Sequence, residues 1–153
     1  MRRTLSALLL LLAAPLAHAG PVVAFDGGYA LPIEDQPVFE GAGLAGRVGL
    51  SLDLQGVELV PEIGVAWYGT VLPQAGVRLI LGKRTRPGAY AHLVLPLDEP
   101  TPTVGADAGL SLDLGAPRTV GFGLYAGAAT RDLQEDLGRG AAFVGGGTLT
   151  LRF

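Results

Sequence analysis

The segment TLTLRF, residues 148–153, decides the fold of this chain. Its apolar side chains, Leu149, Leu151 and Phe153, stand at every second position, and threonine and arginine fill the positions between them. Successive side chains of a strand point to opposite faces, so a period of two separates an apolar face from a polar one. The segment therefore predicts a two-faced β-strand that ends in an aromatic residue.

Earlier parts of the chain repeat this alternation in segments rich in glycine, valine and threonine, whereas the helical period of 3.6 residues is almost absent. Each segment is long enough for a tilted strand to cross a bilayer, which takes about 9–11 residues. Short and long connections alternate between the segments, as they do in outer-membrane barrels. The expected strands are residues 22–31, 43–54, 57–67, 74–83, 87–96, 103–114, 118–129 and 141–153. The expected tight turns are 55–56, 84–86 and 115–117, and the expected longer loops are 32–42, 68–73, 97–102 and 130–140.

The apolar faces of these strands fit two kinds of barrel. A soluble barrel of the lipocalin type turns its apolar face inward, and a membrane barrel turns it toward lipid. Glycines on the polar faces suit a narrow interior, and lysine, the usual solubilising residue, occurs only at Lys83. Aromatic residues near the strand ends predict two girdles at the membrane interfaces. The expected girdle residues are Phe25, Tyr29, Trp67, Phe122 and Phe143. A soluble periplasmic barrel that binds an apolar ligand in its interior stays as an alternative.

Residues 1–19 have the three parts of a secretory signal peptide: an arginine pair, an apolar run and a small-x-small cleavage site, AHA. The apolar run is too short for a membrane-spanning helix. We expect export by the Sec route and a single barrel domain at residues 20–153. The fold class expected is all-β: an eight-stranded antiparallel up-and-down transmembrane β-barrel preceded by a cleaved signal peptide.

The composition argues against several classes of function. A formal net charge of −3 at pH 7 provides no basic stripe for nucleic acid. The absence of cysteine excludes disulfides, thiolate metal sites and a cysteine nucleophile. His92 is the only histidine outside the predicted signal peptide, and no serine lies within two positions of it. A nucleophile–base–acid set is therefore unsupported, and we expect neither enzymatic activity nor a cofactor or metal ion.

The polar faces carry charges that should meet inside the barrel. Glu62, Arg78 and His92 fall at similar heights on the third, fourth and fifth strands, and Arg47 and Asp107 fall nearer the long loops. Side chains on neighbouring strands lie about 5 Å apart, so Glu62 and Arg78 are expected to form a direct pair. In a narrow barrel such pairs form a plug, because an unpaired buried charge is costly. The alternative is a narrow channel, in which the same residues line a path for ions or small solutes.

The chain as a whole resembles the eight-stranded outer-membrane barrels of the OmpA transmembrane-domain, OmpX and OmpW kind. The resemblance rests on the architecture, the signal peptide and the terminal Phe153. One departure is Pro61, which lies inside the third expected strand and would delete a ladder hydrogen bond.

The resemblance implies that Leu149, Leu151 and Phe153 are recognised by the barrel-assembly machinery during biogenesis. It also implies a location in the bacterial outer membrane, in contact with lipid and lipopolysaccharide. We expect a small, non-enzymatic barrel with a structural or surface-interaction role, and contact with any surface partner through loops 32–42 and 130–140.

Overall fold

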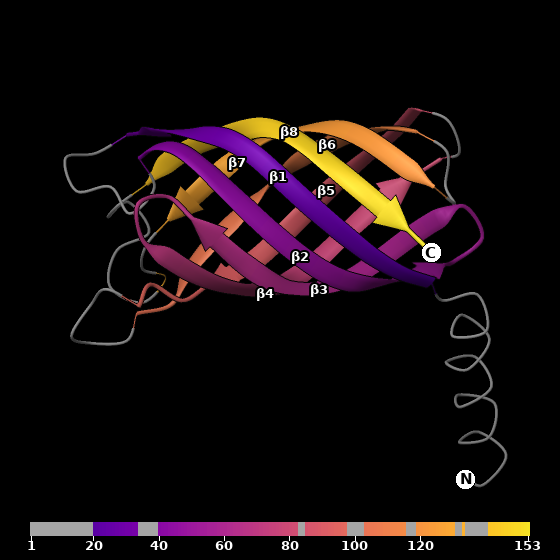
Figure 1. Ribbon diagram of the computed structural model, residues 1–153, viewed down its shortest axis with the longest axis horizontal. Coiled ribbons are helices and arrows are strands. Elements are labelled where there is room, and N and C mark those ends of the chain that lie inside the picture. Colours follow the sequence, from indigo (N-terminus) through magenta and orange to yellow (C-terminus); the bar gives the residue numbers. More distant parts are fainter. Residues whose placement is uncertain are drawn as a thin grey trace, which may run out of the picture.

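The computed structural model shows a closed barrel of eight antiparallel strands, in which each strand pairs with its sequence neighbours and β8 pairs with β1 (Figure 1). The strands are β1 (Gly20–Pro32), β2 (Gly41–Asp53), β3 (Val57–Trp67), β4 (Val71–Leu81), β5 (Thr85–Val94), β6 (Gly105–Gly115), β7 (Val120–Thr130) and β8 (Ala142–Arg152). The structure describes residues 20–33, 40–82, 85–97, 103–115, 119–130, 133 and 141–153. The predicted signal peptide and most of three predicted long loops lie outside these residues. Within the described ranges, no helix is long and apolar enough to span a membrane.

The up-and-down order gives the barrel two distinct ends. The start of β1 and the end of β8 lie at one end (Figure 1), together with the connections β2–β3, β4–β5 and β6–β7. We call this the turn end and the opposite one the loop end. All eight expected strands are present, with bounds that differ from the prediction by at most three residues, so the predicted fold class is confirmed as an all-β, closed, antiparallel barrel.

Two connections differ from the prediction. Strand β4 begins at Val71, so the loop expected at 68–73 is a short turn in which the Tyr68 amide donates to the Thr70 carbonyl (3.2 Å). Gly69 allows this turn, since its φ of 85° is a conformation that side chains disfavour. Strand β5 begins at Thr85, so Arg86, expected in a turn, lies in the strand and is buried.

Pro61 interrupts the pairing of β3 with one of its two neighbouring strands. The β3–β4 ladder runs without interruption past Pro61, which pairs with Val77. The β2–β3 ladder, in contrast, has no pair at Leu50 or Ser51, the positions that face Pro61 and Val60 in its register. A proline has no amide hydrogen to donate, so the interruption falls on the side where that donor is required.

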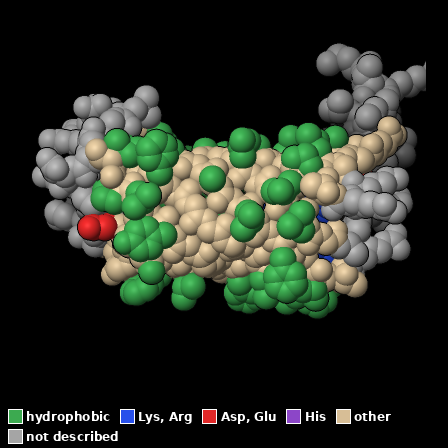
Figure 2. Space-filling view, turned by 90° about the horizontal axis from the view of Figure 1, so that it is seen from above, with side chains coloured by type: hydrophobic (Ala, Val, Ile, Leu, Met, Phe, Trp, Pro, Cys, Tyr) green, Lys and Arg blue, Asp and Glu red, His purple; other side chains and the backbone are tan. Residues whose placement is uncertain are grey.

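The apolar faces of the strands form the outside of the barrel. Ile63 in the middle of β3 is 62% exposed, Leu110 in the middle of β6 is 71% exposed, and Phe122 on β7 is 64% exposed. Figure 2 shows hydrophobic side chains along the visible wall, and the charged side chains seen on this face lie near its two ends. A barrel that binds an apolar ligand in its interior requires these apolar faces to point inward, whereas here they point outward.

Candidate functional site

The inward positions of the strands bring nearly all strand charges into the interior. Glu62 of β3 is the centre of one buried ion-pair network. Its Oε1 atom lies 3.3 Å from Arg47 Nε, 3.2 Å from Arg78 Nη2 and 2.7 Å from His92 Nε2. Arg47 also pairs with Asp26 on β1. Five strands are therefore tied together across the barrel. The loop-side network consists of Asp26, Arg47, Glu62, Arg78, His92 and Asp107.

His92 directs both of its ring nitrogens toward carboxylates. Nε2 lies 2.7 Å from Glu62 Oε1, and Nδ1 lies 3.9 Å from Asp107 Oδ2. The Tyr90 ring stacks on the imidazole with ring centroids 5.3 Å apart. The loop-side network has three carboxylates and two guanidiniums, so it is neutral when the imidazole carries a proton. This geometry suits an ion-pair partner better than the general base of a serine nucleophile.

A second ion-pair network lies nearer the turn end. Arg86 pairs with Glu58, and its Nη1 lies 3.6 Å from Asp113 Oδ2. Arg152 contacts the same two acids, with Nε 3.3 Å from Glu58 Oε1 and Nη2 2.5 Å from Asp113 Oδ2. Two cations and two anions make this group neutral. The turn-side network consists of Glu58, Arg86, Asp113 and Arg152.

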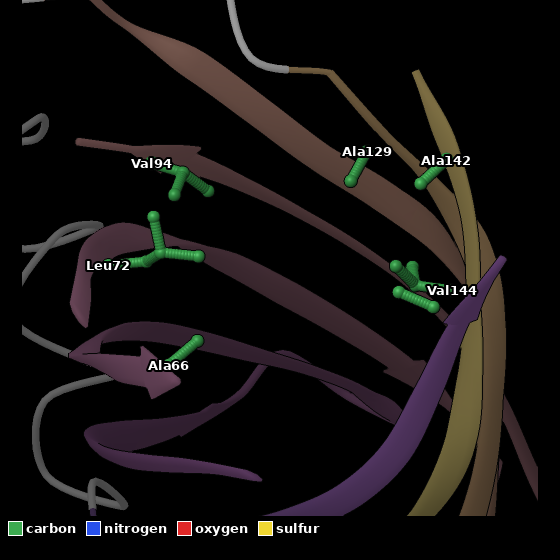
Figure 3. Packing of buried hydrophobic residues seen from close by; sticks show 7 residues of the cluster. Ala66, Leu72, Val94, Ala129, Ala142 and Val144 are labelled. Atoms are coloured by element: carbon green, nitrogen blue, oxygen red, sulfur yellow. The ribbon is translucent and has the colours of Figure 1, made fainter. Parts of the chain in front are cut away.

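Apolar side chains separate and cover the two networks. On β3, Val60 points inward between Glu58 and Glu62 and packs with Val22 and Ile80. A second set closes the interior near the loop end, and Figure 3 shows its side chains pointing from several strands into the space between them. The loop-end apolar layer consists of Ala30, Ala66, Leu72, Val94, Ala129, Ala142 and Val144.

A small cavity lies beside the loop-side network, since Asp26, Arg47, Arg78 and Asp107 line it, and it also touches Ala66 and Val144 of the loop-end apolar layer. Its volume is about 20 Å³ for the centre of a water-sized sphere. That is room for about one or two water molecules. In the part of the chain that the structure describes, no group of three or more acidic or histidine side chains is arranged to hold a metal ion.

Tyrosines fill much of the space around this cavity, and glycines make room for them. The Tyr90 and Tyr125 rings meet edge to face, with centroids 6.2 Å apart. A methyl group at Gly43 would stand 2.3 Å from the ring of Tyr68, so only glycine fits there. Burial raises the pKa of the Tyr68 hydroxyl above its usual value of 10, which keeps this turn residue neutral over the physiological range.

The residues predicted for the membrane interfaces and for assembly lie on the outer wall. Leu149 stands between Phe25 and Phe122, because it pairs with the first across β1–β8 and with the second across β7–β8. Phe153 is 75% exposed beyond the end of β8, where its amide donates to the Pro21 carbonyl (3.1 Å). The remaining residues of these two sets, Tyr29, Trp67, Phe143 and Leu151, also face outward.

The five charged residues expected to meet inside the barrel do lie in one network. Sequence reasoning left Asp26 out of that network and placed Arg86 in a turn. The period of two identifies both as inward residues. Asp26 is in phase with Ala24 and Ala30 on β1, and Arg86 is in phase with Tyr90 and His92 on β5. The tyrosines Tyr68, Tyr90 and Tyr125 and the loop-end apolar layer were not predicted to face the interior, because only charged residues and glycines were assigned to the polar faces.

No protein-family model, no curated protein and no solved structure matches this chain. Its function has therefore to be inferred from the outer wall and the interior.

Proposed function

We propose that this chain is a small, non-enzymatic outer-membrane β-barrel protein of a Gram-negative cell envelope, exported by a Sec-type signal peptide. Its interior is a structural plug of ion pairs, and its outer wall contacts membrane lipid and lipopolysaccharide. Its role is structural or one of surface interaction.

The observation that carries this proposal is the outer wall. Apolar side chains such as Ile63 and Leu110 stand exposed in the middle of the strands, while Glu62 and Asp113 of the same strands are buried inside. Soluble monomers rarely expose an apolar surface larger than a few hundred Å². A closed barrel leaves no strand edge unpaired, which is what the hydrocarbon core of a bilayer requires.

The interior supports a plug rather than a channel. Both ion-pair networks are balanced in charge when His92 is protonated, and apolar side chains lie between them and above them. The cavity beside the loop-side network has room for only about one or two water molecules. We expect planar bilayers that contain the folded protein to stay silent. Single-channel currents abolished by substitution of Glu62 or Arg78 would favour the narrow-channel alternative.

The experiment that tests the membrane proposal uses one substitution at two places. Ile63→Arg puts a charge in the middle of the wall, and Leu97→Arg puts it beyond the end of β5, where the native side chain is equally exposed. A lipid-facing arginine near the bilayer centre costs about 2–4 kcal/mol and one near the interface about 0–1 kcal/mol. Ile63→Arg should therefore sharply lower the yield of heat-modifiable, protease-resistant barrel in outer-membrane lipid, and Leu97→Arg should not.

A water-facing wall would give the opposite result. In that case Ile63→Arg would improve solubility, and the chain would stay monomeric in buffer without detergent.

A second experiment tests the assembly signal. Phe153→Ala should reduce barrel formation in cells but not refolding in micelles. Phe143→Ala, the same change on the outward face of β8, is the matched control. Equal yields of the two variants in cells would remove the proposed role of Phe153.

A further inference from the structure

Polar side chains from four strands point into the small cavity beside the loop-side network. One atom of each has no hydrogen-bond partner among the described residues: Asp26 Oδ1, Gln74 Nε2, Ser111 Oγ and Thr148 Oγ1. Asp26, Gln74 and Thr148 are 6%, 6% and 7% exposed, so bulk water does not reach them freely. Asp26 and Thr148 are direct neighbours across the β1–β8 ladder, and the other two approach from β4 and β6.

The chemistry of these atoms restricts what can satisfy them. Buried donors and acceptors in folded proteins nearly always have partners. Gln74 Nε2 can only donate, Asp26 Oδ1 as a carboxylate can only accept, and the hydroxyls of Ser111 and Thr148 can do either. The carboxylates of Asp26 and Asp107 would repel an anion, and the guanidiniums of Arg47 and Arg78, which line the same cavity, would repel a cation. Water both donates and accepts, so it fits the whole set.

We propose that this cavity is an internal water site, in which about one or two ordered water molecules bridge Asp26, Gln74, Ser111 and Thr148. The cavity volume of about 20 Å³ matches that number of waters. The bound water connects four strands across the interior, next to the loop-side network to which Asp26 belongs. The site does not depend on the proposed membrane location, because it lies inside the barrel whichever solvent meets the wall.

The test is solution NMR on the folded, isotope-labelled protein, in micelles or in buffer according to where it folds. Water bound inside should give nuclear Overhauser cross-peaks, with the sign of a long-lived complex, at the backbone amides of Ser111 and Thr148. Cross-peaks that are absent from both amides in the wild-type protein would overturn the proposal without the need for any variant.

Two threonines on β8 provide a matched pair of variants. Thr148 and Thr150 both point inward, both are buried, and neither hydroxyl has a partner among the described residues, but only Thr148 lines the cavity. Thr148→Val should abolish the water cross-peak at the Ser111 amide and lower the denaturant midpoint. Thr150→Val should keep both. Thr148→Ser, which retains the hydroxyl, should restore the cross-peak, and equal behaviour of the two valine variants would contradict a water site.

Discussion

Replacing Glu62 by glutamine removes the charge at the centre of the loop-side network while it keeps the size of the side chain. The carboxylate oxygen lies 3.3 Å from Arg47 Nε and 3.2 Å from Arg78 Nη2. At an effective dielectric constant of about 20, each of these attractions is worth about 5 kcal/mol. Removal of the carboxylate from water costs several kcal/mol and offsets part of that sum, so the expected net loss is about 3–5 kcal/mol.

The assay is a denaturant titration of the folded barrel, followed by the fluorescence of Trp67, the single tryptophan of the chain. Glu40→Gln is the control, since it makes the same chemical change at an exposed position. The double variant Glu62→Gln/Arg78→Met should recover part of the loss, because Arg78 has no other ion-pair partner among the described residues. Both glutamine variants within about 1 kcal/mol of the wild type would refute the reasoning, since exposed charges rarely contribute more than that.

Three further predictions concern an inward glycine of β3, the proline of the same strand and the tyrosine that follows it. Gly64→Ala should prevent or strongly weaken folding, because its methyl group would stand 2.2 Å from the Gly46 carbonyl oxygen. Gly27→Ala is the control and should be tolerated, since the nearest atom to its methyl group would lie at 3.7 Å. The refolding yields of the two variants test the difference, and equal yields would contradict it. Pro61→Val should change stability by less than about 1 kcal/mol, since a gained hydrogen bond offsets the lost rigidity of proline. Its new amide should be protected in hydrogen exchange, and fast exchange would mean that the β2–β3 ladder stays open. Because burial raises the Tyr68 pKa above 10, the folded state favours the neutral phenol, so stability should fall as the pH rises above that value. Tyr68→Phe should show a smaller alkaline loss in the same titration, and an unchanged loss would exclude Tyr68 as its source.

Much of the architecture follows from local pattern. The alternation in segments such as 148–153 depends only on the geometry of a single strand, and it correctly predicted eight antiparallel strands and the apolar residues that share the outer face, such as Ile63 and Leu110. The bounds of β4 and β5 were less accurate. The turns that precede them depend on glycines with positive φ, Gly69 and Gly82, whose conformation the alternation does not reveal.

The sequence by itself thus determined the number of strands, their order, and which side chains share a face, because all three follow from a period of two and from chain connectivity. The closed barrel decided that the apolar face is the outer one. Only the closed tertiary structure decided which interior charges meet. Arg152 and Glu58 are 94 residues apart, and their contact depends on the register and closure of the whole barrel. The same closure placed Val60 between two ion-pair networks and left a cavity beside Thr148. No local pattern carries that information, since each of these contacts joins strands whose relative height is set by every ladder between them.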